Sequence, residues 1–358
     1  MIPGDWVLVT DGGNGQARST LAAVRSLARA GYRPAVTVSA PLSIAAASRH
    51  CGRAVPVPLV TDPDYEAAVK AELAAHDYLA VLAASDAALL ALGAPVEHLV
   101  DKGVVAERAA GAGLLVPPTR RFASRQELLD SGRSLDYPVV VKPMLSFRPV
   151  VRIASAAELP ARVTADGPAL VQPFLGERLR ALGGVAWRGR LAAAVHQRYL
   201  RTWPPDCGTA CAAETVEPDP ELEAAVLGLL YGFEGVFQAQ LAGPYLLDLN
   251  PRVYGSLPLA VEAGANLPAV YCDLLRGVER DVVRARPGVF YRWLEGDLRH
   301  LFAGVRDGSL GLGAAVRALL PRRGAAHSTE SLSDPLPAVS RLRFALSSSR
   351  RRGPATRG

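Results

Sequence analysis

The chain has 358 residues, of which 49% are hydrophobic and 21% are charged, a composition that can bury a sizeable core and excludes a disordered protein. This length predicts two or three packed lobes. The 40 basic and 34 acidic residues give a formal net charge of +6, and the six arginines of residues 340–358, a stretch without acidic residues, account for all of that excess. A solvated basic tail therefore explains the charge, and only weak contact of this tail with nucleic acid or anionic lipid stays open.

No apolar run reaches the ~20 residues that a membrane-spanning helix needs. The start of the chain also lacks the basic segment and long apolar stretch of a signal peptide, so we expect a cytoplasmic protein without a membrane span. Four cysteines stand far apart. Cys207 and Cys211 have the spacing of a metal-binding pair, but no second pair of Cys or His residues accompanies them, which favours ordinary reduced thiols.

The first 95 residues have the rhythm of a parallel sheet with covering helices. Short apolar runs at residues 6–10, 33–39 and 79–83 predict buried strands, and apolar positions at helical spacing predict a helix over 19–30. Strand, helix and strand in this order are typical of a small α/β lobe.

A glycine-rich turn follows the first predicted strand. Gly13-Asn14-Gly15 begins a dinucleotide-binding fingerprint, but Arg18 stands where its third glycine belongs, and no acidic residue ends the second strand. The pattern favours a tight turn at the edge of the sheet, and a turn that faces a substrate stays open.

The rest of the chain alternates helices with β-rich segments. A helix is expected from residue 101 onward, followed by a break at Pro117-Pro118 and a second short helix before residue 135. Further strands are expected at residues 138–141, 169–172, 185–187, 191–195, 236–241 and 245–249, and helices at 220–231 and 289–320. The short link Ala242-Gly243-Pro244 joins the last two strands into a hairpin.

Four separated pieces of sequence occur in one order, at Asp101-Lys102 with Gly113–Thr119, at Tyr137–Pro143, at Leu170–Glu177 and at Leu246–Arg252. With this ordered set the chain resembles the ATP-grasp superfamily over roughly residues 1–280. It is most similar to a bacterial branch of predicted carboligases that resemble the ATP-grasp domains of carbamoyl-phosphate synthetase. The runs Arg201–Gly208 and Asn250–Ala260 support that branch, and the second lies where the family places its substrate.

The resemblance implies α/β and α+β architecture, namely an ATP-grasp fold with a Rossmann-like α/β lobe before it. The implied divisions are an N-terminal lobe at 1–98, the ATP-grasp domain at 99–280 with a central lobe at 118–172 and a C-terminal lobe at 173–280, a helical extension at 281–322, and a disordered Ser/Pro/Arg-rich tail at 323–358.

The resemblance also implies a nucleotide site. Lys102 and Lys142 match the lysines that hold the α- and β-phosphates of ATP, since phosphoryl transfer depends on positioning and charge neutralisation. Gln172, Phe174 and Glu177 match the segment that meets the adenine edge, the adenine face and the ribose hydroxyls. A solvent-facing lysine at the end of a strand, and a plain strand before a glycine turn, are the alternatives.

A metal site is implied at the end of the chain's last hairpin. Asp248 and Asn250 alternate on one strand and so face the same side, where their oxygens suit Mg²⁺, with Mn²⁺ as a substitute. Turn capping by these residues is the alternative. Gln240 aligns with the family's second metal carboxylate, and an amide there offers an oxygen without charge. Asp248 is also one methylene shorter than the usual glutamate, and residues 144–152 lack the glycines of the family's phosphate-covering loop.

Two arginines are assigned to catalysis. Arg252 matches the residue that stabilises the transferring phosphoryl group. Arg201 is expected to bind a substrate carboxylate as a bidentate fork, with an ordinary surface arginine as the alternative.

Two functions follow. In the first, an ATP-dependent ligase forms an acyl phosphate from a small carboxylate, and an amine or another nucleophile displaces phosphate to form a C–N type bond. In the second, the fold is a nucleotide-binding or regulatory module with little turnover. A dehydrogenase is a distant third. Neither a specific nucleic-acid partner nor a membrane span is expected, and a homodimer stays open.

Overall fold

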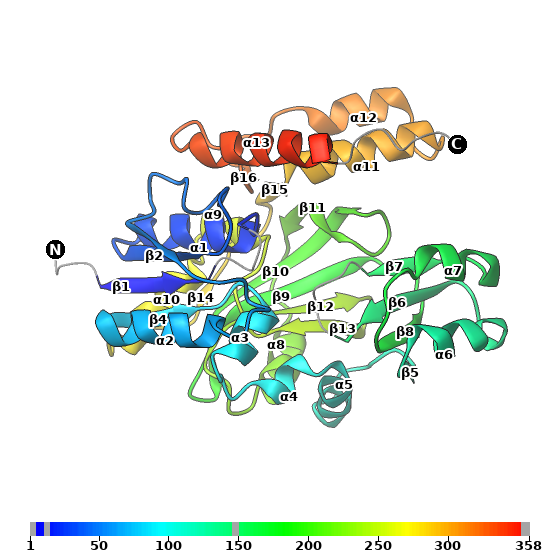
Figure 1. Ribbon diagram of the computed structural model, residues 1–358, viewed down its shortest axis with the longest axis horizontal. Coiled ribbons are helices and arrows are strands. Elements are labelled where there is room, and N and C mark those ends of the chain that lie inside the picture. Colours follow the sequence, from blue (N-terminus) through cyan, green and yellow to red (C-terminus); the bar gives the residue numbers. More distant parts are fainter. Residues whose placement is uncertain (1–4, 11–14, 145–149, 352–358) are drawn as a thin grey trace.

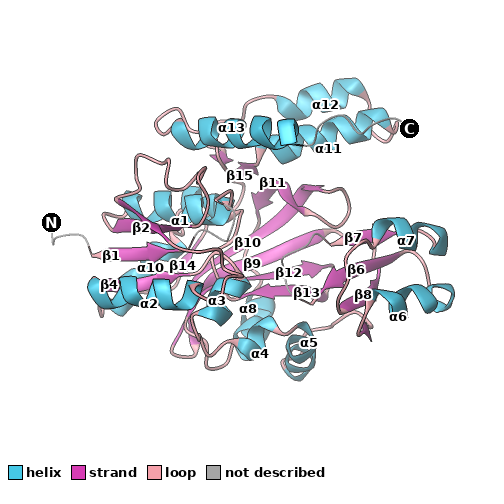
Figure 2. Cartoon of the chain, in the orientation of Figure 1, coloured by secondary structure: helices cyan, strands magenta, loops and turns pink. Residues whose placement is uncertain are grey.

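A computed structural model describes residues 5–10, 15–144 and 150–351. Figure 1 shows three lobes and a layer of helices: the N-terminal lobe lies at one end, a small lobe at the other, and a large sheet between them, with the last helices along one side. Figure 2 shows that strands run through the middle of each lobe. Among the described helices, none combines the length and the hydrophobicity needed to cross a membrane.

The N-terminal lobe is a four-stranded parallel sheet, as its sequence pattern predicts. Its order is β3-β2-β1-β4, with β1 at Trp6–Val9, β2 at Arg33–Val38, β3 at Arg53–Pro56 and β4 at Tyr78–Leu82. Its helices are α1 at Arg18–Arg29, α2 at Tyr65–Ala75 and α3 at Asp86–Ala91. Residues 11–14, most of the glycine-rich turn, lie outside the described residues.

The small central lobe is an antiparallel sheet of order β5-β8-β6-β7 with helices on one face. Its strands are β5 at Arg120–Phe122, β6 at Val139–Pro143, β7 at Val151–Ile153 and β8 at Ala169–Pro173, and its helices are α6 at Arg125–Asp130 and α7 at Leu159–Arg162. The valines of β6 alternate, and Val139 and Val141 pack into a core with Leu128 and Leu159.

The large sheet has the order β13-β12-β9-β10-β11-β15-β16, and β14 pairs with β10. The strands are β9 at Leu179–Trp187, β10 at Arg190–Trp203, β11 at Thr209–Thr215, β12 at Gly235–Ala242, β13 at Tyr245–Asn250, β14 at Val283–Arg284, β15 at Phe290–Arg292 and β16 at Ala326–His327. The helices packed around it are α4 at Glu97–Val100, α5 at Lys102–Gly111, α8 at Pro220–Leu229, α9 at Leu257–Glu262 and α10 at Leu267–Leu275. The expected hairpin of β12 and β13 is present.

Alternate residues of this sheet supply two different cores. Val185 and Val236 pack on the side of α1 and α10, in a core that continues into the N-terminal lobe. Their neighbours Ala186 and Phe237 point to the other face, against α5 and α8. The sheet is therefore buried on both faces, which joins the N-terminal lobe firmly to it.

Two expectations about the C-terminal part are wrong. Residues 290–292 form strand β15 rather than part of a helix, and the helices of this part are α11 at Leu294–Arg306, α12 at Leu312–Leu319 and α13 at Leu336–Arg351. The predicted disordered tail at 323–358 is ordered up to residue 351, because β16 pairs with β15 and α13 follows it; residues 352–358 lie outside the described residues.

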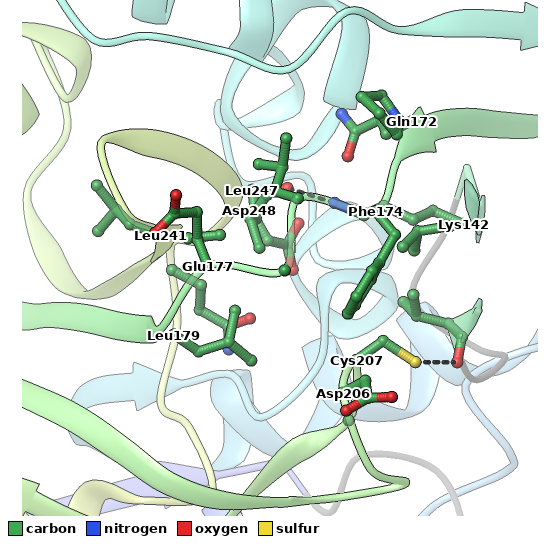
Figure 3. Close-up of a pocket in the computed structure, with 18 of the residues that line it drawn as sticks. Lys142, Gln172, Phe174, Glu177, Leu179, Asp206, Cys207, Leu241, Leu247 and Asp248 are labelled. Carbon is green, nitrogen blue, oxygen red and sulfur yellow. Dashed lines mark hydrogen bonds between the residues drawn. The ribbon is translucent and has the colours of Figure 1, made fainter. Parts of the chain in front are cut away.

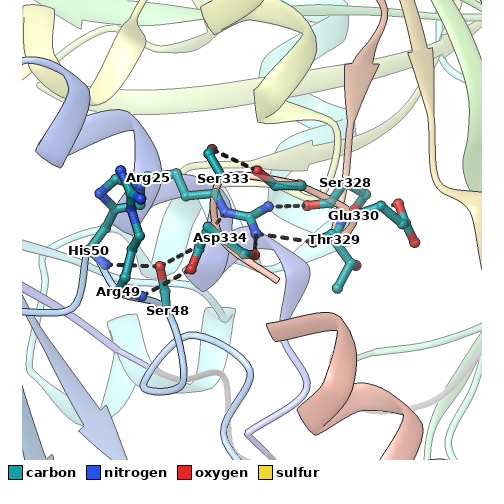
Figure 4. Close-up of polar contacts among 10 residues, drawn as sticks. Arg25, Ser48, Arg49, His50, Ser328, Thr329, Glu330, Ser333 and Asp334 are labelled. Atoms are coloured by element: carbon teal, nitrogen blue, oxygen red, sulfur yellow. Dashed lines mark hydrogen bonds and ion pairs between the residues drawn. The ribbon is translucent and has the colours of Figure 1, made fainter. Parts of the chain in front are cut away.

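Polar residues of the segment that was predicted to be disordered hold it against the N-terminal lobe. Asp334, 1% exposed, forms an ion pair with Arg25 of α1 at 2.8 Å. It also accepts hydrogen bonds from the hydroxyl of Ser48 at 2.7 Å and the backbone amide of Arg49 at 3.0 Å (Figure 4). Each charge is thus compensated by a partner more than 280 residues away in the chain, which a local sequence pattern cannot reveal.

Replacing Arg25 with Ala should destabilise the protein by about 3 kcal/mol. This is the lower end of the range for breaking a buried ion pair, because Ser48 and Arg49 still bind Asp334. Unfolding in urea measures the change. Arg29→Ala is the matched control on the same helix. Its partner Glu262 is 41% exposed at the side chain and Arg29 61%, so less than about 1 kcal/mol is expected. Equal losses from both variants would contradict the prediction.

Candidate functional site

Two connected cavities lie where the three lobes meet. The first, of about 760 Å³ including space open to solvent, lies between the central lobe and the large sheet. The second, of about 1350 Å³ on the same measure, extends from there to the start of α1 in the N-terminal lobe. The lining residues that they share are Lys102, Lys142, Val150, Tyr199, Cys207, Gly208, Gln240 and Asp248. One continuous space therefore reaches all three lobes.

Lys102 enters this space from the first turn of α5. The side chain of Asp101 begins the helix by accepting hydrogen bonds from the backbone amides of Gly103 and Val104. This cap places Lys102 next in the chain, with its Nζ 2.6 Å from Oδ1 of Asp248. Burial acts to lower the pKa of Lys102, but the attraction of Asp248 outweighs burial and the pKa is raised. Lys102 is therefore a fixed cation.

Lys142 reaches the same point from β6. Three buried valines precede it, and its Nζ donates a hydrogen bond to the backbone carbonyl oxygen of Leu247 at 2.9 Å (Figure 3). Burial lowers the pKa of Lys142 to about 8, although Asp248 opposes this change. Burial also acts to raise the pKa of Asp248, but the positive charges of Lys102 and Lys142 outweigh it and the net pKa is lowered.

Gln172 and Phe174 line the first cavity from the end of β8. Gln172 is 8% exposed, and its Nε2 donates to the hydroxyl of Thr119 at 2.9 Å, whereas its Oε1 has no hydrogen-bond partner among the described residues. The guanidinium of Arg152 lies 4.5 Å from the centre of the Phe174 ring. Glu177 lies further along the same wall. Figure 3 shows Gln172, Phe174 and Glu177 around the cavity. An unsatisfied buried carbonyl beside an aromatic face suits a flat ligand that carries an N–H donor.

Polar pairs on β12 and β13 form the floor between the cavities. The register places Gln240 opposite Asp248 and Gln238 opposite Asn250, so all four side chains project from one face. Arg252 follows β13, and its Nη2 donates to Oδ1 of Asn250 at 2.6 Å. Gln240 and Asp248 therefore face each other across the β12–β13 hairpin.

This floor offers few charges to a metal ion. No group of three His, Cys, Asp or Glu side chains with metal-binding geometry occurs among the described residues. Asp248 supplies one carboxylate, and Asn250 and Gln240 supply amide oxygens. Mg²⁺ accepts oxygen ligands of this kind when one or two carboxylates are supplemented by phosphates and water. The donor set thus fits Mg²⁺ that arrives with a phosphate-bearing ligand and does not form a closed cage for the ion.

Arg252 lies in the second cavity, as its assignment requires, and its position is fixed from the N-terminal lobe. Its Nε lies 2.5 Å from Oδ1 of Asp86, the first residue of α3. Asp86 is only 7% exposed. The N-terminal lobe therefore helps to aim a cation at the floor between the cavities.

Arg201 does not line either cavity, so the expectation that it meets substrate there gains no support. Its Nε and Nη2 lie 2.5 and 3.1 Å from the two carboxylate oxygens of Asp297 on α11. Asp297 is fully buried and also pairs with Arg292 at 3.2 Å. Register shifts flank Arg201 on both sides in its pairing with β11, and such bulges redirect side chains away from simple alternation.

Several residues that line the cavities have no motif of their own in the sequence. Tyr199, Trp203 and Gly208 lie on or beside the run that contains Arg201, and these residues line the second cavity, whereas Arg201 does not. Gly208 permits the close return of this loop, because a Cβ there would meet the backbone of Trp203 at 2.1 Å. Arg18 carried no motif signal. The phosphate-covering loop expected within residues 144–152 includes 145–149, which lie outside the described residues.

This architecture, with a central lobe facing a large sheet across a cavity lined by lysines, is the ATP-grasp fold, as the sequence predicted. Residues 166–297, which run from β8 into α11, match the family model described as ATP-grasp in the biosynthetic pathway with Ter operon. No curated protein sequence matches the chain.

Solved structures with this fold cover most of the chain. The L-amino acid ligase from Bacillus licheniformis has 17% identity over 81% of this chain and 80% of its own, with a TM-score of 0.59. The N5-carboxyaminoimidazole synthetase from Staphylococcus aureus complexed with ADP has 14% identity over 79% and 80%, with a TM-score of 0.60. The N5-carboxyaminoimidazole ribonucleotide synthetase from Thermus thermophilus has 17% identity over 78% and 81%, with a TM-score of 0.56. Such low identity establishes the fold and not the reaction.

We predict that a triphosphate probe, ATP, binds beside Lys142 more weakly as the pH rises above about 8. Below its pKa of about 8, Lys142 already carries the charge that a phosphate would bind, whereas above this pH binding must take up a proton. Affinity then decreases by up to about tenfold per pH unit. Titration calorimetry between pH 6.5 and 9.5 measures the profile. In the control Lys142→Arg, the guanidinium keeps its charge throughout, so a steep fall in that variant too would remove Lys142 as the cause.

Proposed function

We propose that this chain is an ATP-dependent ligase that activates a small carboxylate as an acyl phosphate. The observation that carries the proposal is the convergence of Lys102, Lys142 and Asp248, which come from three different segments, at the junction of two cavities. One cavity offers a flat apolar slot and the other a cationic chamber, which suits the adenosine and the acid-binding halves of such a reaction.

ATP is proposed to occupy the first cavity. The unsatisfied Oε1 of Gln172 would accept the adenine amino group, Phe174 would pack on the ring, and Glu177 would meet the ribose hydroxyls. Lys102 and Lys142 would hold the phosphates above the floor. Both ammonium groups are fixed before the ligand arrives, by Asp248 and by a backbone carbonyl respectively, so little reorganisation is needed on binding.

Mg²⁺ would be held by Asp248, Asn250 and Gln240, and when bound it would neutralise part of the phosphate charge. The protein's own cation at this place is Arg252, fixed by Asp86 and Asn250. It would stabilise the negative charge that develops on the transferring phosphoryl group.

The proposed chemistry has two steps. A carboxylate oxygen of the acid attacks the γ-phosphorus of ATP, the bond to the bridging oxygen breaks, and ADP leaves. An amine or another nucleophile then attacks the acyl carbon, loses a proton and expels phosphate. A cytoplasmic location and a homodimer remain predictions.

A nucleotide-binding module with little turnover is the alternative, and one observation favours it. The floor holds two glutamines and an asparagine around one carboxylate, so the charge available to fix a metal ion is small. This arrangement would bind nucleotide and slow the phosphoryl transfer.

Phosphate release separates the two functions. The ligase should release phosphate only when ATP, Mg²⁺ and a suitable acid are all present, with pooled carboxylic and amino acids as the acid source. A thermal shift with ATP is expected under both functions. A shift with no phosphate release from any pool would support the binding module and contradict the ligase, and a shift with NAD(P) instead of ATP would contradict both.

Replacing Gln240 with Glu should increase the affinity for Mg²⁺ in the presence of ATP by about tenfold. The change places a second carboxylate opposite Asp248, and a hard divalent cation gains directly from ligand charge. Titration of phosphate release or of ATP binding against Mg²⁺ measures it. The matched variant Asp248→Asn should shift the Mg²⁺ requirement in the opposite direction. An unchanged requirement in Gln240→Glu would remove Gln240 from the metal site.

A further inference from the structure

Arg18 differs from the other cations around the second cavity in its contacts. It is the first residue of α1 and lines the cavity together with Lys102, Lys142 and Arg252. Each of those three cations has an anionic or carbonyl partner, in Asp248, the Leu247 carbonyl and Asp86. No carboxylate oxygen of the described residues lies within 4 Å of the Arg18 guanidinium, and its described polar contacts and stacking are all with neutral groups.

Those neutral groups hold the guanidinium in a defined place. It lies 3.8 Å from the centre of the Trp293 ring, and its Nη1 donates to the hydroxyl of Tyr291 at 3.0 Å and to the hydroxyl of Ser328 at 3.5 Å. Tyr291 and Ser328 are buried. An arginine fixed by an aromatic face and by hydroxyls keeps its full charge available and loses little entropy when it binds an anion.

Gly255 allows the Arg18 guanidinium to pack directly against bare backbone. A Cβ on Gly255 would lie 3.2 Å from Nη2 and 3.4 Å from Cζ of Arg18, which is tighter than ordinary van der Waals contact. The cavity wall beside Arg18 thus includes the bare backbone of Gly255.

The ordered tail takes part in this arrangement. Arg25 donates hydrogen bonds to the backbone oxygens of Ser328 and Thr329 at 3.4 and 3.0 Å and pairs with Asp334 (Figure 4). The nearby carboxylate of Glu295 is already bound by Arg341 at 2.8 and 3.0 Å. The tail therefore positions Ser328 under Arg18 while a second arginine occupies the acidic group that could otherwise neutralise it.

The lining of the second cavity carries an excess of positive charge. Its described lining contains four cations, Arg18, Lys102, Lys142 and Arg252, and the single acid Asp248. The two lysines and Arg252 meet at the end where ATP is proposed to deliver its phosphoryl group. Arg18 extends the positive charge to the N-terminal lobe, where no phosphate of ATP is needed.

We infer that Arg18 binds a second anionic group of the acid substrate, so that the acid carries one carboxylate at the Arg252 end and a further carboxylate or phosphate at the Arg18 end. This inference rests on the proposed function and names its substrate class. The acid substrate would extend from the point of phosphoryl transfer to Arg18, and the carboxylate at the first of these ends would be the one that is activated. A guanidinium binds either anion as a bidentate fork.

The test compares dicarboxylic acids of three to six carbons, the monoamides of the same acids, and phosphorylated hydroxy acids. Binding of each probe to the full chain is measured by calorimetry, and KM by phosphate release with ATP and Mg²⁺. At least one acid with a second anionic group should bind about 10- to 100-fold more tightly than its neutral counterpart, the range expected for hydrogen bonds to a charged group. The dicarboxylate and phosphate arms tell which anion is preferred.

Arg18→Gln should remove this preference by raising KM for the anionic acid and leave the affinity for ATP unchanged. Arg33→Gln is the matched control, because Arg33 also stacks on a tryptophan, Trp6 at 4.1 Å, but is exposed and lines neither cavity. Gly255→Ala is the second variant, in case Arg18→Gln loses stability. It keeps the charge and crowds the guanidinium, and the same loss of preference is expected.

The two proposals fail in different ways. If wild-type protein binds ATP and releases phosphate with an acid, but Arg18→Gln and Gly255→Ala keep the KM and the preference, the assignment of Arg18 is overturned. If no acid with a second anionic group binds better than its neutral counterpart, the assignment is also overturned. Failure of the proposed function alone would show as acid binding that depends on Arg18 without any phosphate release.

Discussion

The contact between Lys102 and Asp248 is the interaction on which the site depends. It joins the start of α5 to the end of the β12–β13 hairpin across 146 residues of sequence, with 2.6 Å between Nζ and Oδ1. Burial alone would discharge both groups, and each keeps the other ionised, as the raised pKa of Lys102 and the lowered pKa of Asp248 show. Lys142, which lacks so close a carboxylate, has its pKa lowered to about 8 instead.

The rest of the chamber is built around this ion pair as a surface of positive charge. Arg252 is aimed by Asp86, from the N-terminal lobe, and Arg18 by Trp293 and Tyr291, from the C-terminal part. The floor of the chamber carries one carboxylate, Asp248, beside the amides of Gln240 and Asn250, so the cations around it exceed the negative charge. Such a chamber favours polyanionic ligands over free metal ions. The excess of positive charge therefore agrees both with the small number of metal-binding carboxylates and with the proposed acid that carries two anionic groups.

The C-terminal segment links the lobes that form the chamber. It contributes β16 to the large sheet and Asp334 to the N-terminal lobe. Because the same segment supplies Ser328 to Arg18, the stability of this segment and the shape of the second cavity depend on common contacts. A tail of this composition is thus a structural part of the site.

The sequence by itself determined the fold class, the positions of the longer strands and several residues that line the first cavity. Local alternation in β6 and β13 and the ordered Lys, Gln, Asp and Asn positions carry that information, because they depend on neighbours in the chain. Only the tertiary structure decided which arginine faces the second cavity. Arg201 lies in a run that reads as substrate-binding, but bulges turn it to buried Asp297, whereas Arg18 has no motif and gains its place from Trp293, Tyr291 and Ser328. Partners more than 270 residues away in sequence set the direction of that side chain, and no local pattern of hydrophobicity or charge encodes such a contact.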